Sequence, residues 1–122
     1  MRAIPIIITI VFTTLGQLVF KKGIDSLIVS PGKDIISIVK YFINALMNGW
    51  VVLGFILALC AAFSWMLALR NYELSSAYPF QSLNFILVPM LSILLYSESF
   101  NSYKLIGILI IVFGIIIFSK GI

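Results

Sequence analysis

Histidine is absent from this 122-residue sequence, cysteine occurs once, and acidic residues occur only four times. Without histidine the chain has no histidine-ligated metal site and no imidazole base. The lone Cys60 excludes an internal disulfide and a cysteine-rich metal site. All four acids lie outside the centres of the long apolar segments, so no carboxylate pair is available for acid–base catalysis. We therefore expect no metal, no cofactor and no enzyme activity.

Charge of either sign is scarce as well. Charged residues make up 10% of the chain and hydrophobic residues 62%, against about 25% and 45–50% in an average soluble domain. A soluble domain of this size needs polar residues to cover its large surface. The composition therefore predicts an integral membrane protein. The net charge of +4 comes from scattered Lys and Arg, which is typical of residues flanking membrane spans and not of nucleic-acid binding.

Four apolar segments approach the length of about 20 residues that a helix needs to cross a bilayer core of about 30 Å. They are residues 4–20, 50–69, 77–96 and 103–118. Because backbone groups in lipid must be satisfied internally, all four are expected to be helices. The sequence predicts a single all-α domain over residues 1–122, a bundle of four transmembrane helices. Lys21 and Lys22 stand where a signal-peptide cleavage site would fall, so we expect the first helix to be retained.

The longest connection, between the first two spans, contains a further amphipathic segment at residues 33–48. Ser30-Pro31-Gly32 predicts a turn before it. Polar residues then recur every three or four positions, which gives one narrow polar stripe on an apolar helix: Lys33, Ser37, Lys40, Asn44 and Asn48. This helix either lies in the membrane interface or extends the second span. A fifth crossing is disfavoured because Lys40 would lie near its centre.

The distribution of Lys and Arg between the two sides of the membrane is nearly balanced. One side would carry Arg2, Arg70 and Lys120, and the other Lys21, Lys22, Lys33, Lys40 and Lys104. This bias of three against five nominally places the long first loop inside the cell. A count so close to balance also permits insertion in both orientations.

The first span carries a polar stripe, in which Thr9, Thr13, Gln17 and Lys21 are spaced four residues apart. The stripe is either one wall of a hydrophilic groove or a set of threonines bonded to their own helix with a lysine that reaches the interface. Gln17 favours the first interpretation, because an amide has four hydrogen-bonding positions that a helix cannot satisfy by itself.

The third span is the richest in polar groups. Ser75 and Ser76 are placed to cap it, and Pro79 falls in its first turn. Its interior polar residues, Gln81, Ser82 and Asn84, would form a head-group site or hydrogen bonds that hold the bundle together. A kink is expected at Pro89, whose ring removes one backbone hydrogen bond. In the second span, Trp65 either lines a cavity or packs between helices.

The fourth span has glycines at positions 107 and 114, and Glu98 precedes it. Gly107 and Gly114 lie on one side of the helix and allow close approach of another backbone, within the chain or in a dimer. Glu98 is expected to interact favourably with the helix N-terminus.

Several motifs together resemble a known family. The run over residues 69–79, Ser82-Leu83-Asn84-Phe85, Glu98, Gly107 and Gly114 is similar to the EamA-like group of the drug/metabolite transporter superfamily. Within it the chain resembles the small four-helix subunits that flip undecaprenyl-phosphate-linked aminoarabinose, and Gly16-Gln17-Leu18 followed by Lys21 agrees. The related small multidrug resistance proteins depend on a glutamate in the first helix. No acid occurs in that helix here, which argues against proton-coupled export of cationic drugs.

The resemblance implies a transporter that flips a polyprenyl-phosphate-linked sugar or similar lipid across the bacterial cytoplasmic membrane. Its partner is expected to be a second copy or a similar small four-helix subunit. In the expected mechanism a groove opens between the first and third spans, and Lys21 and Arg70 attract the phosphate. The substrate-binding set is Gln17, Lys21, Trp65, Arg70, Tyr78, Gln81, Ser82 and Asn84. The alternatives are a small-solute or multidrug exporter and a non-transporting membrane subunit that stabilises another protein.

Overall fold

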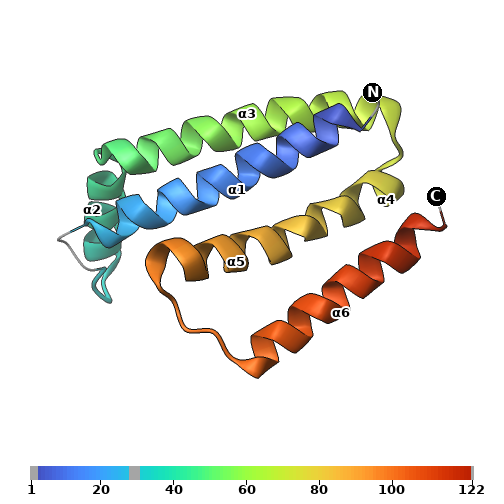
Figure 1. Cartoon of the computed structure of the whole chain (residues 1–122). Coiled ribbons are helices and arrows are strands. Elements are labelled where there is room, and N and C mark those ends of the chain that lie inside the picture. The colour runs from blue at the N-terminus through green and yellow to red at the C-terminus, as the bar shows by residue number, and fades with distance from the viewer. Residues whose placement is uncertain (1–2, 28–30, 122) are drawn as a thin grey trace.

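The computed structural model describes residues 3–27 and 31–121, which form helices and no strand. Arg2, counted in the charge balance, and Ser30, part of the predicted turn, lie outside the described residues. Figure 1 shows the arrangement of the helices along the chain. In order they are α1 (Ile4–Asp25), α2 (Ile35–Leu46), α3 (Gly49–Asn71), α4 (Leu74–Ala77), the 3₁₀ helix η1 (Tyr78–Leu83), α5 (Asn84–Tyr96) and α6 (Ser102–Ser119).

Four of these helical units are long and apolar enough to cross a membrane, which confirms the predicted bundle. They are Ile4–Asp25, Gly49–Asn71, the composite Leu74–Tyr96 and Ser102–Ser119. The first extends beyond its predicted end at residue 20. In that extension, Lys21 and Asp25 lie one helical turn apart, and Lys21 Nζ forms an ion pair of 3.1 Å with Asp25 Oδ1. Opposite charges at this spacing stabilise a helix.

Helices α1 and α3 form the most closely packed pair, running antiparallel at one side of the molecule (Figure 1). Small residues face each other at their contact. A Cβ atom placed on Gly16 would lie 3.4 Å from the carbonyl oxygen of Gly54, and one placed on Gly54 would lie 3.3 Å from that of Gly16. Such residues let two membrane helices approach closely. The composite third span packs on α1, and α6 diverges from the rest of the bundle (Figure 1).

The amphipathic segment forms a separate helix, α2, which lies across the end of the α1–α3 pair (Figure 1). It does not extend α3, because Asn48 has an extended backbone and caps the next helix. The Asn48 Oδ1 atom accepts a hydrogen bond of 2.9 Å from the Trp50 backbone N–H. An apolar cavity of about 350 Å³ remains where α2 meets the two long helices, lined in part by Tyr41, Phe42 and Phe55.

The third span departs from the single α-helix that the sequence predicts, because a 3₁₀ segment divides it. Glu73, and neither Ser75 nor Ser76, occupies the N-cap of α4. The chain then tightens into η1 at Tyr78, with Pro79 in its first turn. Proline cannot donate the backbone hydrogen bond that would continue the α-helix, and short 3₁₀ turns are frequent connectors between helical segments. The α-helix α5 contains Pro89 in its interior, and the kink there stays a prediction. The helical geometry itself changes over η1, Tyr78–Leu83.

The start of α6 is capped by a residue that the sequence analysis does not single out, and the favourable effect of Glu98 on this helix N-terminus stays a prediction. Asn101, and not Glu98, caps this helix, and its Oδ1 atom accepts a hydrogen bond of 2.9 Å from the Lys104 backbone N–H. A short neutral side chain at the N-cap position satisfies an exposed N–H group directly, which leaves the Glu98 carboxylate out of the cap.

Candidate functional site

A chain of hydrogen bonds between uncharged side chains joins α1 to the third span near the middle of both. The Thr14 hydroxyl donates to Asn84 Oδ1 at 2.9 Å, and Asn84 Nδ2 donates to Gln81 Oε1 at 3.0 Å. Thr14 is buried, and the two amides are half-buried. In transporters, substrate sites commonly lie near the bilayer midplane where helices are discontinuous. This polar chain has both properties, because η1 interrupts the third span there.

The 3₁₀ geometry of η1 explains why the two amides meet. In a 3₁₀ helix the side chains at positions i and i+3 eclipse each other, and Gln81 and Asn84 have this spacing. The Gln81 side chain uses its oxygen in this bond, and within the described part of the chain its amide nitrogen donates to no protein group. In the same part of the chain, no fully buried side-chain polar atom lacks a hydrogen-bond partner. The two N–H groups of Gln81 are therefore accessible and available to an acceptor such as a hydroxyl or phosphate oxygen.

Ser82 points to a different part of the molecule. It lines a cavity of about 280 Å³ between η1 and α6, together with Pro79, Gly114 and Phe118. A second cavity of about 260 Å³ lies between α5 and α6. Between the first and third spans, the Thr14–Asn84 bond and a bond from the Tyr96 hydroxyl to the Leu18 carbonyl oxygen join α1 to α5. Toward the N-terminal end of α1, a cavity of about 400 Å³ separates α1 from η1, and the opening of a groove between the two spans stays a prediction. Two of the hollows along the third span face α6.

Trp65 and Tyr78 lie together near the opposite end of α3 from Trp50. Their rings pack edge to face, with centroids 6.1 Å apart and an angle of 72° between the planes. Trp65 also packs against the buried cluster that includes Ala68 and Ala77, a contact that favours packing between helices, and its part in substrate binding stays a prediction. Tyr78 remains largely exposed. Arg70, in the last turn of α3, is exposed at the same end.

Gln17 and Lys21 are both exposed and lie toward the C-terminal end of α1. The neighbouring Lys22 ammonium lies 4.0 Å from the centre of the Trp50 ring, at the beginning of α3. About 20 residues of α3 separate Trp50 from Arg70, which corresponds to about 30 Å along the helix. Lys21 and Arg70 are therefore at opposite ends of the bundle. This agrees with the charge count along the sequence, which puts the two residues on opposite sides of the membrane, and each can meet a phosphate only on its own side.

The model of one protein family matches nearly the whole chain. It describes the EamA-like transporter family, and residues 6–120 match it. The chain belongs to the EamA-like transporter family. Together with the four apolar helices, this membership identifies a multi-pass membrane protein and confirms the resemblance inferred from the sequence.

Individual relatives of this EamA-like protein carry a more specific name. The probable 4-amino-4-deoxy-L-arabinose-phosphoundecaprenol flippase subunit ArnE of Enterobacter sp. (strain 638) is 35% identical over 57% of this chain and 64% of that protein. The protein of the same name from Pseudomonas aeruginosa (strain UCBPP-PA14) is 27% identical over 99% of both chains. No solved structure matches this chain.

Two threonines of this EamA-like chain form different kinds of hydrogen bond, one within α1 and one to the third span. The Thr9 hydroxyl donates to the Pro5 carbonyl oxygen at 2.7 Å, which is the structural interpretation of the polar stripe. Thr14, outside that stripe, makes the contact to the third span. Thr14 lies four residues from the apolar Ile10 and Leu18, and all three are buried in the structure; the spacing alone indicates a shared face and does not show that the hydroxyl bonds to another helix. A lone hydroxyl on an apolar buried face needs a partner there.

Proposed function

We propose that this protein is one subunit of a flippase that moves a polyprenyl-phosphate-linked sugar across the bacterial cytoplasmic membrane. The relatives named as aminoarabinose-phosphoundecaprenol flippase subunits support this substrate class. The observation that carries the proposal is the uncharged chain Thr14–Asn84–Gln81 at mid-membrane. In this proposal these side chains form hydrogen bonds with the sugar at the middle of the bilayer, where the hydrocarbon core contains no water to do so.

The energetic problem for such a substrate is its head group, because the polyprenyl tail stays in the bilayer. Burying a polar group without a hydrogen-bond partner costs several kcal/mol, roughly 2–7 for one hydroxyl or amide. The free N–H groups of Gln81 lower this cost on the side of α1, and the Ser82 hydroxyl offers a further hydrogen bond only to a head group in the cavity beside α6. Lys21 at one end and Arg70 at the other supply a cation for the phosphate on each side.

The arrangement of charge favours lipid movement over exchange of a cation for a proton. The acids Asp25, Asp34, Glu73 and Glu98 lie at helix ends or in loops. A carboxylate at the centre of a span is what alternate binding of a cationic drug and a proton requires. We propose that movement of the lipid is not coupled to protons within this subunit.

A second subunit completes the pathway in this proposal, as a homodimer or a heterodimer with a similar small protein. No residue of α6 is buried. A Cβ atom placed on Gly107 or Gly114 would meet no atom within 4 Å. Gly107 also lines the cavity between α5 and α6, and Gly114 lines the cavity between η1 and α6. In this proposal a helix of the second subunit therefore packs beside α6 at the open edge of these cavities.

The test is transport in proteoliposomes, with a labelled polyprenyl phosphate that carries one sugar and with a labelled cationic dye as the probe for export. Lipid movement without dye movement is expected. Lys21→Gln should slow lipid movement about tenfold, because one charge-assisted hydrogen bond to phosphate is lost. Lys21→Arg should restore most of the rate. Lys40→Gln, an exposed lysine on α2, is the matched control and should have no effect.

Two results would contradict the proposal. Dye movement that survives Lys21→Gln would favour a solute exporter. Absence of lipid movement, both for the protein alone and with each similar small subunit co-expressed from the same genome, would favour a non-transporting partner.

A further inference from the structure

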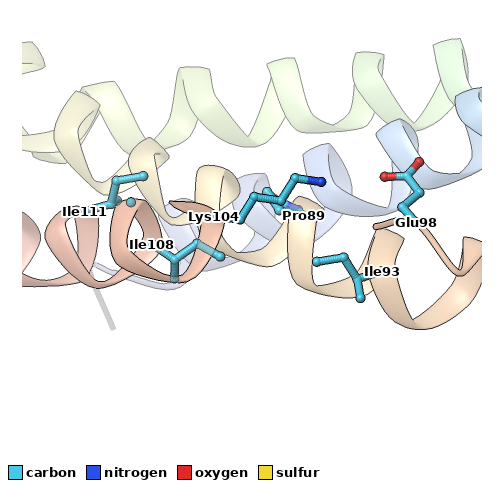
Figure 2. Close-up of a pocket in the computed structure, with 7 residues that line it drawn as sticks. Pro89, Ile93, Glu98, Lys104, Ile108 and Ile111 are labelled. Atoms are coloured by element: carbon cyan, nitrogen blue, oxygen red, sulfur yellow. The ribbon is translucent and has the colours of Figure 1, made fainter. Parts of the chain in front are cut away.

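The cavity between α5 and α6 has an apolar wall and a charged end. Its volume is about 260 Å³, and it is lined by Pro89, Ile93, Glu98, Lys104, Gly107, Ile108 and Ile111. Figure 2 shows Glu98 and Lys104 toward one end of the cavity and Ile111 toward the other. A cavity with an apolar wall and a charged end is complementary to a lipid, whose chain is apolar and whose head group is polar. Because α6 diverges from the bundle there, such a lipid can enter sideways from the bilayer.

The two charged groups that line this cavity form no ion pair with each other in the described part of the chain. The Lys104 ammonium donates a hydrogen bond to the Ser99 carbonyl oxygen. Over residues 3–27 and 31–121 the single ion pair joins Lys21 and Asp25, so the Glu98 carboxylate has no ion-pair partner there. Both charges are exposed to whatever occupies the cavity mouth.

The loop that carries Glu98 is fixed at both ends. Ser97 ends α5 in the left-handed conformation, with φ of 52°. Asn101 caps α6 through the Lys104 backbone N–H. A residue other than glycine is uncommon in this conformation. At Ser97 it turns the chain sharply away from the axis of α5. Glu98 and Lys104 are therefore presented by a short, anchored turn, which is a suitable base for a binding site.

We propose that this cavity binds the head group of a lipid that carries both a phosphate and a primary ammonium group. Lys104 binds the phosphate, Glu98 binds the ammonium, and the first isoprene units lie against Ile108 and Ile111. The inference rests on the proposed function, and it goes further by assigning the amino group of an aminosugar to a residue. It also gives the lipid a place to bind before it reaches the mid-membrane chain.

The pair of opposite charges explains selection as well as binding. An anionic lipid without an amine would experience repulsion from Glu98, and a cationic amphiphile would experience repulsion from Lys104. Only a head group with both charges gains from both residues. Specificity that combines attraction to one ligand with repulsion of its competitors is a general feature of recognition sites.

The test measures binding at the cavity directly, in nanodiscs of phosphatidylcholine. A benzophenone amino acid replaces Ile108 in the cavity or Leu109 on another face of α6, which lines a different hollow. The probes are labelled polyprenyl phosphates carrying an aminopentose or the corresponding neutral pentose. Unlabelled phosphatidylethanolamine, which also holds a phosphate and a primary amine, serves as a competitor. Cross-linking of the aminopentose lipid at position 108 and not at position 109 is expected.

Substitutions then separate the two charges. Glu98→Gln should weaken binding of the aminopentose lipid about tenfold and leave the neutral-pentose lipid unchanged or bound more tightly. Lys104→Gln should weaken both about equally. Glu73→Gln and Lys40→Gln, at an exposed acid and an exposed lysine outside this cavity, are matched controls and should alter neither.

Equal loss of both lipids in Glu98→Gln would overturn the assignment of the ammonium group. Equal cross-linking at positions 108 and 109 would overturn the site itself. Displacement of the aminopentose lipid by a modest excess of phosphatidylethanolamine would overturn its identity as a substrate site. Each of these failures leaves the transport assay intact, so a protein that flips the lipid without binding it here retains its proposed function.

Discussion

Thr14 and Asn84 lie 70 positions apart in the sequence, and a hydrogen bond of 2.9 Å joins their side chains. The bond connects α1 to the first residue of α5. It lies at the place where the third span changes from 3₁₀ to α-helical geometry. In a protein whose spans contain few polar groups, one such contact determines how two helices are placed along each other.

The first prediction concerns the energy of that bond. Thr14→Val keeps the shape of the side chain and removes the donor, and it should lower the free energy of unfolding by about 1 kcal/mol, within the range measured for hydrogen bonds between membrane helices. Thr13→Val, at the half-buried neighbour, is the control and should cost less. Unfolding in detergent micelles by added dodecyl sulfate, followed by circular dichroism, measures both. Equal costs would show that the hydroxyl of Thr14 contributes nothing specific.

The sequence determines the membrane spans well because their signal is the length of an apolar run. It locates their ends less well, since these depend on contacts such as Lys21–Asp25. It also misses η1, because a 3₁₀ segment and an α-helix have the same apolar pattern over six residues. Gln81 and Asn84 are recognisable as polar residues in lipid. Thr14 is not, because a hydroxyl can be satisfied within its own helix, as Thr9 shows.

The second prediction concerns the close approach of α1 and α3. A Cβ atom on Gly23 would lie 2.7 Å from Val51 Cγ2 and 2.8 Å from the Val51 backbone nitrogen. Because a backbone atom cannot move away by a change of rotamer, Gly23→Ala should force α1 and α3 apart and lower the free energy of unfolding by about 1–3 kcal/mol. Gly49→Ala is the control, since a Cβ there would meet nothing within 4 Å. The same unfolding assay compares them, and a harmless Gly23→Ala would show that this contact is loose.

The third prediction concerns the junction between α2 and α3. Asn48 accepts from the Trp50 N–H at 2.9 Å and donates to the Ser26 hydroxyl oxygen at 2.8 Å. Asn48→Ala removes these two bonds and a longer one of 3.4 Å from the Val51 N–H, and it should cost about 1–2 kcal/mol, the upper part of the range for an N-cap. Asn48→Asp retains the capping oxygen and loses the donor, so its stability should be intermediate. If Asn48→Asp is as unstable as Asn48→Ala, the cap contributes little and the bond to Ser26 dominates.

The last prediction concerns the open face of α6. Leucine at Gly107 and Gly114 should leave the fold of one subunit intact, because a Cβ atom at either position meets no atom of the chain within 4 Å. If a second subunit packs against these glycines, the double substitution should weaken dimerisation by at least about tenfold, equivalent to about 1.4 kcal/mol. Sedimentation equilibrium in micelles measures association, and circular dichroism verifies the helix content. Gly49→Leu adds the same side chain in open space at the start of α3 and should not change association. Unaltered dimerisation in the double variant would place the subunit contact on another helix.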